Sequence, residues 1–291
     1  MSEAAQATEK RWPAGRLEPL DFGKPLPEPP KVSFFGPGMV LVALGVGLGE
    51  LFMWPRLVIL FGANIRWLFL VGMFCQVFAM MEIARWSMAT GESTFQAAAR
   101  VWKPFMWFFW VLALITYVWP GHIALGAGAV ENMFGIPWLY TAIGGIVLMG
   151  LILTFSPVAY EAIEKILSII ISIVVASGFV TAAFVGTAGE WWDAIKGLFM
   201  IGWTDPRMFT PEWFPVLVGS IAFAGPSGMQ QMWYSLFLRD KQAGMMVYSG
   251  RITSWLTGEQ EEMPDHGCMF DTSNPEEMRK WQGWRKWNYF D

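Results

Sequence analysis

Long apolar blocks alternate with short polar segments along the chain, and each block is long enough to cross a membrane. An α-helix rises about 1.5 Å per residue, so about 20 apolar residues span the hydrocarbon core of a bilayer. The pattern therefore predicts an all-α membrane protein with six transmembrane helices. The six blocks are residues 38–61, 67–88, 105–130, 138–155, 166–185 and 215–238.

The blocks divide the chain into three parts. Residues 1–35 form a polar, Pro-rich segment without the features of a signal peptide, and we expect a mobile cytoplasmic tail there. The transmembrane domain covers residues 36–238, and residues 239–291 form a polar cytoplasmic segment.

The Lys and Arg residues predict the orientation in the membrane. With the N-terminus inside, only four of the 20 fall outside, and these are Arg56, Arg66, Lys196 and Arg207. Because Lys and Arg favour the cytoplasmic side, we expect a multi-pass protein of the cell membrane with both termini in the cytoplasm.

Composition supports this class and argues against others. The 291 residues are 54% hydrophobic and 15% charged, against about 25% charged residues in a soluble domain. Cys75, Cys268 and the two histidines, His122 and His266, are too few and too scattered for a conventional zinc cluster. There is no Ser/His/Asp constellation and no phosphate loop, so we expect no enzyme and no cofactor. The net charge of −4 gives no reason to invoke nucleic acid.

The first apolar block contains an unusual run of glycines followed by an acid. Gly45, Gly47 and Gly49 each cost a helix about 1 kcal/mol relative to Ala, so together they favour local unwinding. Small residues also let helices approach closely, which is the structural alternative. Glu50 follows at mid-span, where an acidic side chain normally faces a cavity, a cation or a partner. Arg56 is the nearest candidate for an ordinary ion pair.

The sixth block repeats the anomaly. Gly225, Pro226, Ser227 and Gly228 lie at mid-span, followed by the amides Gln230 and Gln231. Proline removes a backbone donor, and open backbone at this depth is tolerated only inside protein or beside a watery cavity. The alternative is a simple proline kink. Interrupted first and sixth spans are typical of transporters built from five-helix inverted repeats, whose substrate binds between the breaks.

Several segments resemble the Nramp family of divalent-metal transporters. GPGMVLVALGVGLGE (36–50) and MEIARWSMATGESTFQAAAR (81–100) are similar to its first helix and to its second helix with the following turn. GAVENMFGIPWLY (128–140) and AYEAIEKILSIIISIV (159–174) resemble its third-to-fourth loop and the start of its fifth helix. The resemblance covers about residues 36–245. It implies the five-plus-five inverted-repeat fold of the amino acid/polyamine/organocation superfamily, with unwound helices 1 and 6.

The sequence departs from the family at the metal-binding positions. Gly47-Leu48-Gly49-Glu50 stands where the family has Asp-Pro-Gly-Asn, so the acid moves from the first position to the fourth. The family's Met-Pro-His corresponds either to Gly225-Pro226-Ser227 or to Ser227-Gly228-Met229. In both alignments the usual thioether and histidine are displaced, so the resemblance implies only the location of the site.

That location offers mainly oxygen ligands. We expect the metal site to comprise the Glu50 carboxylate, backbone carbonyls, a hydroxyl and an amide, from Glu50, Gly47, Ala222, Gly225, Ser227 and Gln230. Hard oxygen ligands suit magnesium, calcium or manganese, although Met229 and Met232 are close enough in sequence to restore a sulfur ligand.

We therefore expect a secondary active transporter that moves a divalent cation of the Mg or Mn class by alternating access, with the cation as substrate and membrane lipid around it. A proton-coupled symport would need further titratable groups such as His122, which is equally explained by helix packing. Glu82 and Arg85 are spaced to pair on one helix face and are read as structural.

Two alternatives remain. The chain could be an amino acid carrier of the same fold, or a non-transporting membrane subunit or incomplete fragment. A five-plus-five fold needs ten helices, whereas the sequence supplies the first repeat and the opening helix of the second. A second polypeptide or a missing C-terminal half is therefore an expected partner.

Overall fold

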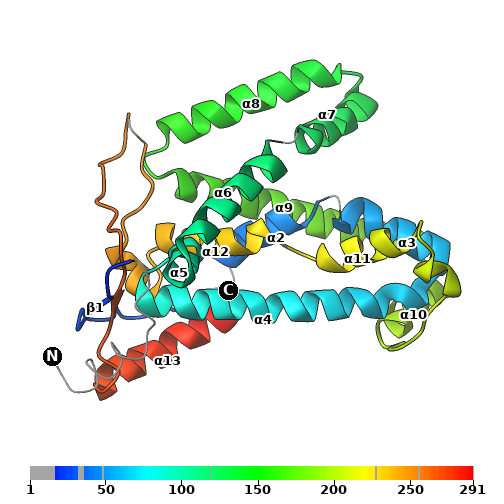
Figure 1. Cartoon of the computed structure of the whole chain (residues 1–291). Helices are drawn as coiled ribbons and strands as arrows, with labels where there is room; N and C mark the ends of the chain where they lie inside the picture. The colour runs from blue at the N-terminus through cyan, green and yellow to red at the C-terminus, as the bar shows by residue number, and fades with distance from the viewer. Residues whose placement is uncertain are drawn as a thin grey trace. The chain divides into compact units, whose positions relative to one another are not determined.

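The computed structural model describes residues 17–31, 36–47, 49–118, 120–226, 228–254 and 256–290, which are mainly helical (Figure 1). The chain forms two compact units. Unit 1 comprises Met1–Pro27, Ser87–Ile163 and Arg239–Lys280, and unit 2 comprises Glu28–Trp86, Glu164–Leu238 and Trp281–Asp291.

Helices cover the six apolar blocks, although the blocks 38–61, 105–130 and 215–238 are each divided between two helices, and further helices lie outside the blocks. The helices are α2 (Pro37–Gly45), α3 (Trp54–Phe61), α4 (Trp67–Thr90), α5 (Thr94–Val101), α6 (Lys103–Tyr117), α7 (Gly121–Phe134), α8 (Trp138–Phe155), α9 (Ala159–Val185), α10 (Ala188–Leu198), α11 (Phe214–Ala222), α12 (Met229–Asp240) and α13 (Pro275–Phe290). Short 3-10 turns occur at Ala63–Arg66, Pro206–Phe209 and Gly244–Tyr248, and a π-helical turn at Gly49–Met53. Strands β1 (Asp21–Phe22) and β2 (Cys268–Met269) pair in parallel.

Several helices are long and apolar enough to span a membrane, which confirms the predicted all-α class and the presence of candidate spans. Within the described residues they are Ala63–Thr90, Lys103–Phe134, Trp138–Phe155 and Tyr160–Val185, with Pro37–Gly45 and Gly49–Phe61 as a fifth, bent candidate. The sixth predicted span, 215–238, is divided between α11 and α12 and is not among these candidates.

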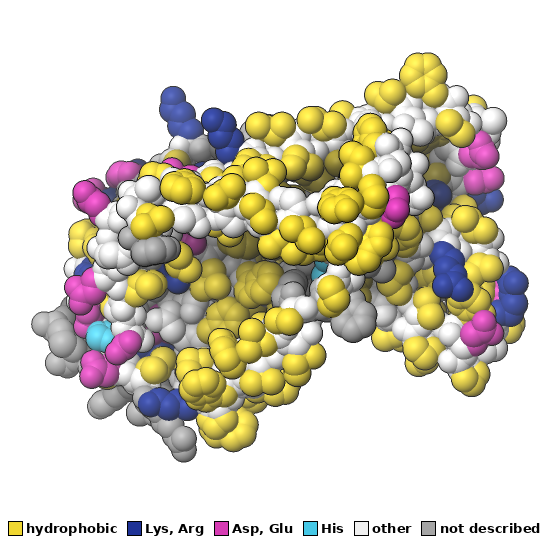
Figure 2. All heavy atoms as spheres, turned by 90° about the horizontal axis from the view of Figure 1, so that it is seen from above, with side chains coloured by type: hydrophobic (Ala, Val, Ile, Leu, Met, Phe, Trp, Pro, Cys, Tyr) yellow, Lys and Arg dark blue, Asp and Glu magenta, His cyan; other side chains and the backbone are white. Residues whose placement is uncertain are grey.

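The candidate spans expose most of their apolar surface. Only 0 to 17% of the most hydrophobic stretch of each of the four unbent spans is buried. Hydrophobic side chains cover much of the face shown in Figure 2. Exposed large hydrophobic side chains in such number mark contact with lipid or with another protein.

The core of unit 2 forms around α3. Its apolar positions Trp54, Leu57, Val58 and Phe61 recur at the spacing of one helix face, so they pack together on one side. Trp54 meets Phe69 of α4 edge to face, with ring centroids 5.2 Å apart. The other buried members of this core are Ile65, Met208, Leu217 and Ala224. This core holds α3 against α11, beside the helix breaks.

In unit 1 the N-terminal segment is ordered against the C-terminal segment. Asp21 lies opposite Cys268 in the parallel pair, and Tyr248 donates a hydrogen bond to the Pro25 carbonyl at 2.8 Å. Leu26 is buried, and its N–H donates to Glu277 at 2.5 Å. Residues 21–26, which belong to the segment 1–35 in which the sequence predicts a mobile tail, thus have defined partners, whereas residues 1–16 and 32–35 lie outside the described residues. The partners of residues 21–26 lie more than 200 residues away, so a local pattern does not reveal them.

Candidate functional site at two helix breaks

The first helix break separates α2 from α3 in unit 2. Helix α2 ends at Gly45, and the π-helical turn Gly49–Met53 leads into α3, with a bend of 44° between the two halves. The predicted unwinding at the glycine run is therefore present. Leu48 lies outside the described residues.

The second break separates α11 from α12. Helix α11 ends at Ala222 and α12 begins at Met229. Between them, Gly225 has a φ of +111° and Gly228 a φ of +56°, conformations that residues with a side chain rarely adopt. Pro226 has no N–H to continue a helix. The sixth predicted span is thus interrupted where the sequence indicates.

Glycines allow the two breaks to touch. A Cβ atom on Gly45 would lie 2.9 Å from the Pro226 ring, and one on Gly49 would lie 2.7 Å from the Phe223 carbonyl oxygen. Both distances are shorter than carbon side chains tolerate, so only glycine fits. Both interpretations of the glycine run, local unwinding and close approach of helices, are therefore correct.

Glu50 joins the two breaks through its carboxylate. Oε1 accepts a hydrogen bond from the Gly225 N–H at 2.6 Å, and Oε2 accepts one from the Gly47 N–H at 3.2 Å. Broken helices leave backbone N–H groups without helical partners, and a carboxylate satisfies them well. Glu50 therefore stabilises both unwound segments and fixes their relative position within unit 2.

Two glutamine side chains satisfy the freed carbonyls. The Gln76 side-chain amide on α4 donates to the Ala222 carbonyl at 2.8 Å, and the Gln230 amide donates to the Leu44 carbonyl at 3.3 Å. Gln76 is 9% exposed, and its Oε1 has no hydrogen-bond partner among the described residues. That oxygen lies 3.1 Å from the position of a Cβ on Gly225. A buried acceptor without a donor thus faces the second break.

No basic side chain of the described residues forms an ion pair with Glu50. Arg56, the partner that the sequence suggests, lies over the Trp213 ring instead, 5.1 Å from its centroid. The structural alternative for Glu50, an ordinary ion pair with Arg56, is therefore not present, and the guanidinium lies instead against an aromatic ring 157 positions later in the sequence. Glu50 therefore obtains only neutral backbone donors from the described residues.

A cavity of about 490 Å³ opens beside Glu50 in unit 2. Its lining is mostly apolar, and Glu50 and Arg66 are its charged members. The other lining residues are Trp54, Pro55, Val58, Ile59, Phe69 and Leu198. Glu50 is therefore accessible from a space large enough for a hydrated ion or a small organic molecule.

The structure brings most of the expected site residues together, but in different roles. Gly47 and Gly225 present N–H donors to Glu50, whereas the sequence predicts carbonyl ligands there. The carbonyl of Ala222 is at the site and accepts from Gln76. Gln230 donates across the breaks. Ser227 lies outside the described residues.

Sequence reasoning missed Gln76. Its signal is a single amide within the otherwise apolar run WLFLVGMFCQVFAMM (67–81), where a polar side chain needs a partner. The described residues contain no group of three His, Cys, Asp or Glu side chains that could hold a metal ion. Any cation at the breaks would therefore depend on one carboxylate and neutral oxygens.

Glu82 and Arg85 form the predicted pair on α4, at 2.5 Å on the exposed surface of the helix. His122 lies in α7, in unit 1.

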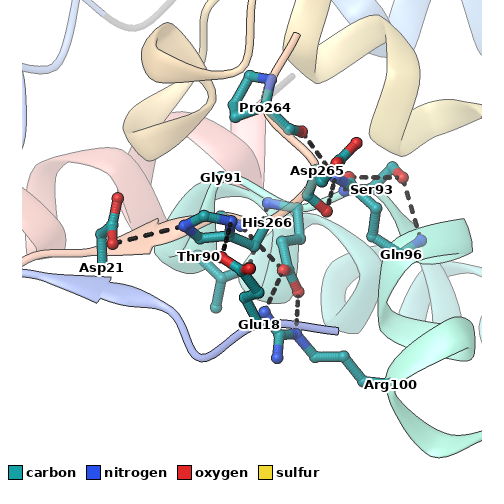
Figure 3. A network of polar contacts seen from close by, with 12 residues as sticks. Glu18, Asp21, Thr90, Gly91, Ser93, Gln96, Arg100, Pro264, Asp265 and His266 are labelled. Atoms are coloured by element: carbon teal, nitrogen blue, oxygen red, sulfur yellow. Dashed lines mark hydrogen bonds and ion pairs between the residues drawn. The ribbon is translucent and has the colours of Figure 1, made fainter. Parts of the chain in front are cut away.

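A second polar cluster lies in unit 1 (Figure 3). The Arg100 guanidinium donates to both oxygens of Glu92, at 2.7 and 2.6 Å, and both side chains are buried. Glu92 also accepts from the Gly267 N–H at 2.9 Å, and Gln96 donates to the Asp265 carbonyl at 3.4 Å. The cluster thereby attaches the segment around residues 264–267 to the start of α5.

His266 lies at the edge of this cluster, between two carboxylates. Its Nε2 is 3.4 Å from Asp21, and its Nδ1 is 3.6 Å from Glu18 (Figure 3). These contacts connect the N-terminal segment to the same C-terminal segment that Glu92 holds.

Comparison of the chain with protein-family models, with curated proteins and with solved structures found no match.

Proposed function

We propose that the chain is a membrane transport protein, related to the Nramp type, that carries a divalent cation by alternating access and binds it at the two helix breaks. The observation that carries this proposal is Glu50. Its carboxylate connects both breaks, faces a cavity and has no basic partner among the described residues. A negative charge within a candidate span is costly unless a cation compensates it, so a cation is the ligand that this site favours.

The atoms around Glu50 favour a hard cation. An ionised carboxylate has about four acceptor positions, and the Gly225 and Gly47 N–H groups occupy two of them. Gln76 Oε1 and the second acceptor position of the Ala222 carbonyl add neutral oxygens. Oxygen donors suit Mg²⁺, Ca²⁺ and Mn²⁺. With a single carboxylate, the cation would keep part of its water shell.

The hydrogen bonds across the breaks suggest how the site could open and close. Glu50 to Gly225, Gln230 to Leu44 and Gln76 to Ala222 each join two helices of unit 2. Movement of one half-helix would exchange these bonds for contacts with the ion and with water. Such an exchange costs little because each group keeps a polar partner.

An amino acid carrier is the second candidate, and the cavity favours it. Its lining combines apolar walls with the Glu50 carboxylate and the Arg66 guanidinium, which could hold the ammonium and carboxylate of an apolar amino acid. Against this reading, Glu50 already occupies the Gly225 and Gly47 N–H groups that would otherwise bind a substrate carboxylate at a helix end. We therefore rank the cation first.

Transport assays on the reconstituted chain distinguish these functions. Proteoliposomes containing a fluorescent metal indicator should show Mn²⁺ influx that Mg²⁺ or Ca²⁺ competes with, and Glu50→Gln should abolish it. Gln76→Leu should weaken cation binding about tenfold, which corresponds to about 1.4 kcal/mol, since it removes one neutral oxygen ligand. Glu212→Gln is the matched control, because it removes an exposed glutamate outside the breaks.

Each alternative has its own outcome. Flux that persists in Glu50→Gln would refute the ligand role. Uptake of a labelled apolar amino acid that requires both Glu50 and Arg66, without metal flux, would establish the second candidate. Cation binding without flux would retain the site but refute transport by this chain alone.

A further inference from the structure

The outer face of α13 combines positive charge with aromatic rings. Arg285, Lys286, Tyr289 and Phe290 are all exposed, Tyr289 by 55% and Phe290 by 45%. The Arg285 guanidinium donates to the Tyr289 hydroxyl at 3.0 Å and lies 6.0 Å from the centroid of that ring. A cation and an aromatic ring are thus arranged together on the surface of the helix, one turn apart.

The inner face of the same helix is attached to unit 2. Trp284 and Trp287 are buried and meet edge to face, with 5.5 Å between their ring centroids. Tyr234 of α12 donates to the Asn288 side chain at 3.2 Å. Gly283 lies against the Pro29 ring, where a Cβ would be 2.5 Å from a ring carbon. These contacts fix the orientation of residues 281–290 of α13 within unit 2, so the outer face always points away from them.

The outer face carries no acid among the described residues of α13. Successive helical residues are about 100° apart, which places Gln282, Arg285, Lys286, Tyr289 and Phe290 on one side. The acidic residues of α13 are both in its first turn, and one of them, Glu277, is buried and pairs with Lys280 at 2.9 Å. The charge on the outer face is therefore uniformly positive.

We infer that this face, formed by Arg285, Lys286, Tyr289 and Phe290, docks on a membrane surface that contains anionic lipids. Arg and Lys are attracted to phosphate headgroups, and tyrosine is enriched at headgroup depth. An acidic protein would complement the charges alone. An exposed Phe and Tyr beside basic residues suit the boundary between headgroups and acyl chains. The candidate spans of the same chain place a bilayer within reach, and this docking is independent of cation binding at Glu50.

The test uses the full chain reconstituted in vesicles of phosphatidylcholine, with or without phosphatidylglycerol. An environment-sensitive fluorophore is attached at Gln282→Cys, on the outer face, in a Cys75→Ser background. Burial raises the pKa of the Cys268 thiol to about 11, so this cysteine stays unreactive at neutral pH. Lipids brominated near the headgroup quench the fluorophore when α13 docks.

We expect stronger quenching with phosphatidylglycerol, and its reversal by high salt. Arg285→Gln with Lys286→Gln should shift the equilibrium towards the undocked form about fivefold for each cation removed. The matched control neutralises two exposed lysines elsewhere in unit 2, Lys165→Gln and Lys196→Gln, and should change nothing. Tyr289→Ser with Phe290→Ser should also weaken docking.

Quenching that is equal with and without the anionic lipid would overturn the inference. Equal loss in the control pair would also overturn it, since the effect would then reflect net charge. The salt dependence of quenching is measured on the labelled chain that keeps Arg285 and Lys286. The inference can therefore be tested even if a charge variant fails to fold.

Discussion

Glu92 in unit 1 and Glu50 in unit 2 are two carboxylates that each join segments far apart in the sequence. Each accepts a hydrogen bond from a glycine N–H in a segment 175 residues away, Gly267 at 2.9 Å for Glu92 and Gly225 at 2.6 Å for Glu50. The difference lies in their charge partners. Arg100 donates to both oxygens of Glu92, whereas no basic residue of the described chain pairs with Glu50.

This difference separates a structural carboxylate from a binding candidate. Glu92 is fully buried, and a buried charge is tolerated only with a partner, which Arg100 supplies. Glu50 is half-buried beside a cavity and obtains only neutral donors from the protein. The energy of Glu50 would therefore fall further if a cation bound, while Glu92 has nothing left to gain. The same kind of contact, a carboxylate that accepts from a distant glycine N–H, thus serves assembly in one unit and, we propose, transport in the other.

The largest expected effect on stability comes from removing the partner of the buried Glu92 carboxylate. Arg100→Met leaves Glu92 buried without a cation, and loss of one partner of a buried pair costs about 3–5 kcal/mol. Thermal unfolding of the purified chain in mild detergent measures this loss. Arg251→Met is the control, because its pair with Glu261 is partly exposed and contributes less than about 1 kcal/mol. Equal destabilisation by the two variants would contradict the structural role of Glu92.

The second effect concerns the unpaired carboxylate. A cation at 100 times its dissociation constant should stabilise the chain by about 2.7 kcal/mol, because it binds only the folded form. Glu50→Gln should abolish that cation-dependent stabilisation while keeping an acceptor for the Gly225 N–H. The Tm is measured at increasing concentrations of Mn²⁺, Mg²⁺ or Ca²⁺, with Glu212→Gln as the control variant. A cation-dependent rise in Tm that survives Glu50→Gln would remove the contrast between the two carboxylates.

The sequence predicts the positions of the breaks but not their partners. Glycine and proline act on the backbone locally, so Gly45–Glu50 and Gly225–Gly228 mark the interruptions without tertiary information. The partners come from distant helices, so periodicity does not reveal that Gln76 binds the Ala222 carbonyl or that Arg56 turns to Trp213.

The same limit applies to the buried pair in unit 1. Glu92 and Arg100 lie eight residues apart on either side of a helix start, a spacing that does not by itself predict contact. Their burial also depends on Gly267, whose backbone closes over Glu92. The role of such a carboxylate can therefore be inferred only when the segments that pack over it are known.

A third effect tests the close approach that brings Glu50 to the second break. Gly49→Ala places a Cβ 2.7 Å from the Phe223 carbonyl oxygen, and overpacking of this kind costs about 1–3 kcal/mol. Gly47→Ala is a matched control in the same break, because its nearest neighbours would be at an ordinary 3.9 Å. The free energy of unfolding and the cation affinity should both decrease in Gly49→Ala but not in Gly47→Ala. Similar losses in the two variants would indicate that backbone freedom, not close approach, is what the break requires.

The smallest effect adds a partly exposed carboxylate to the comparison. The Arg251 guanidinium donates to Glu261 at 2.8 Å and holds the pKa of that carboxyl below its usual value. Because the folded pKa lies below the unfolded value of about 4.3, the pair stabilises the fold at neutral pH. That contribution is lost as the pH falls from the unfolded value through the folded one. Glu261→Gln should therefore lower stability by less than about 1 kcal/mol at neutral pH.

The pH dependence makes this last expectation decisive. The difference in Tm between the original chain and Glu261→Gln should shrink as the pH is lowered below about 4, because both chains then carry a neutral group at this position. A difference that grew on acidification would require a raised pKa at Glu261 and would reverse the sign of the pair's contribution. Partial exposure explains why the effect is small: water already solvates both groups, which it cannot do for Glu92.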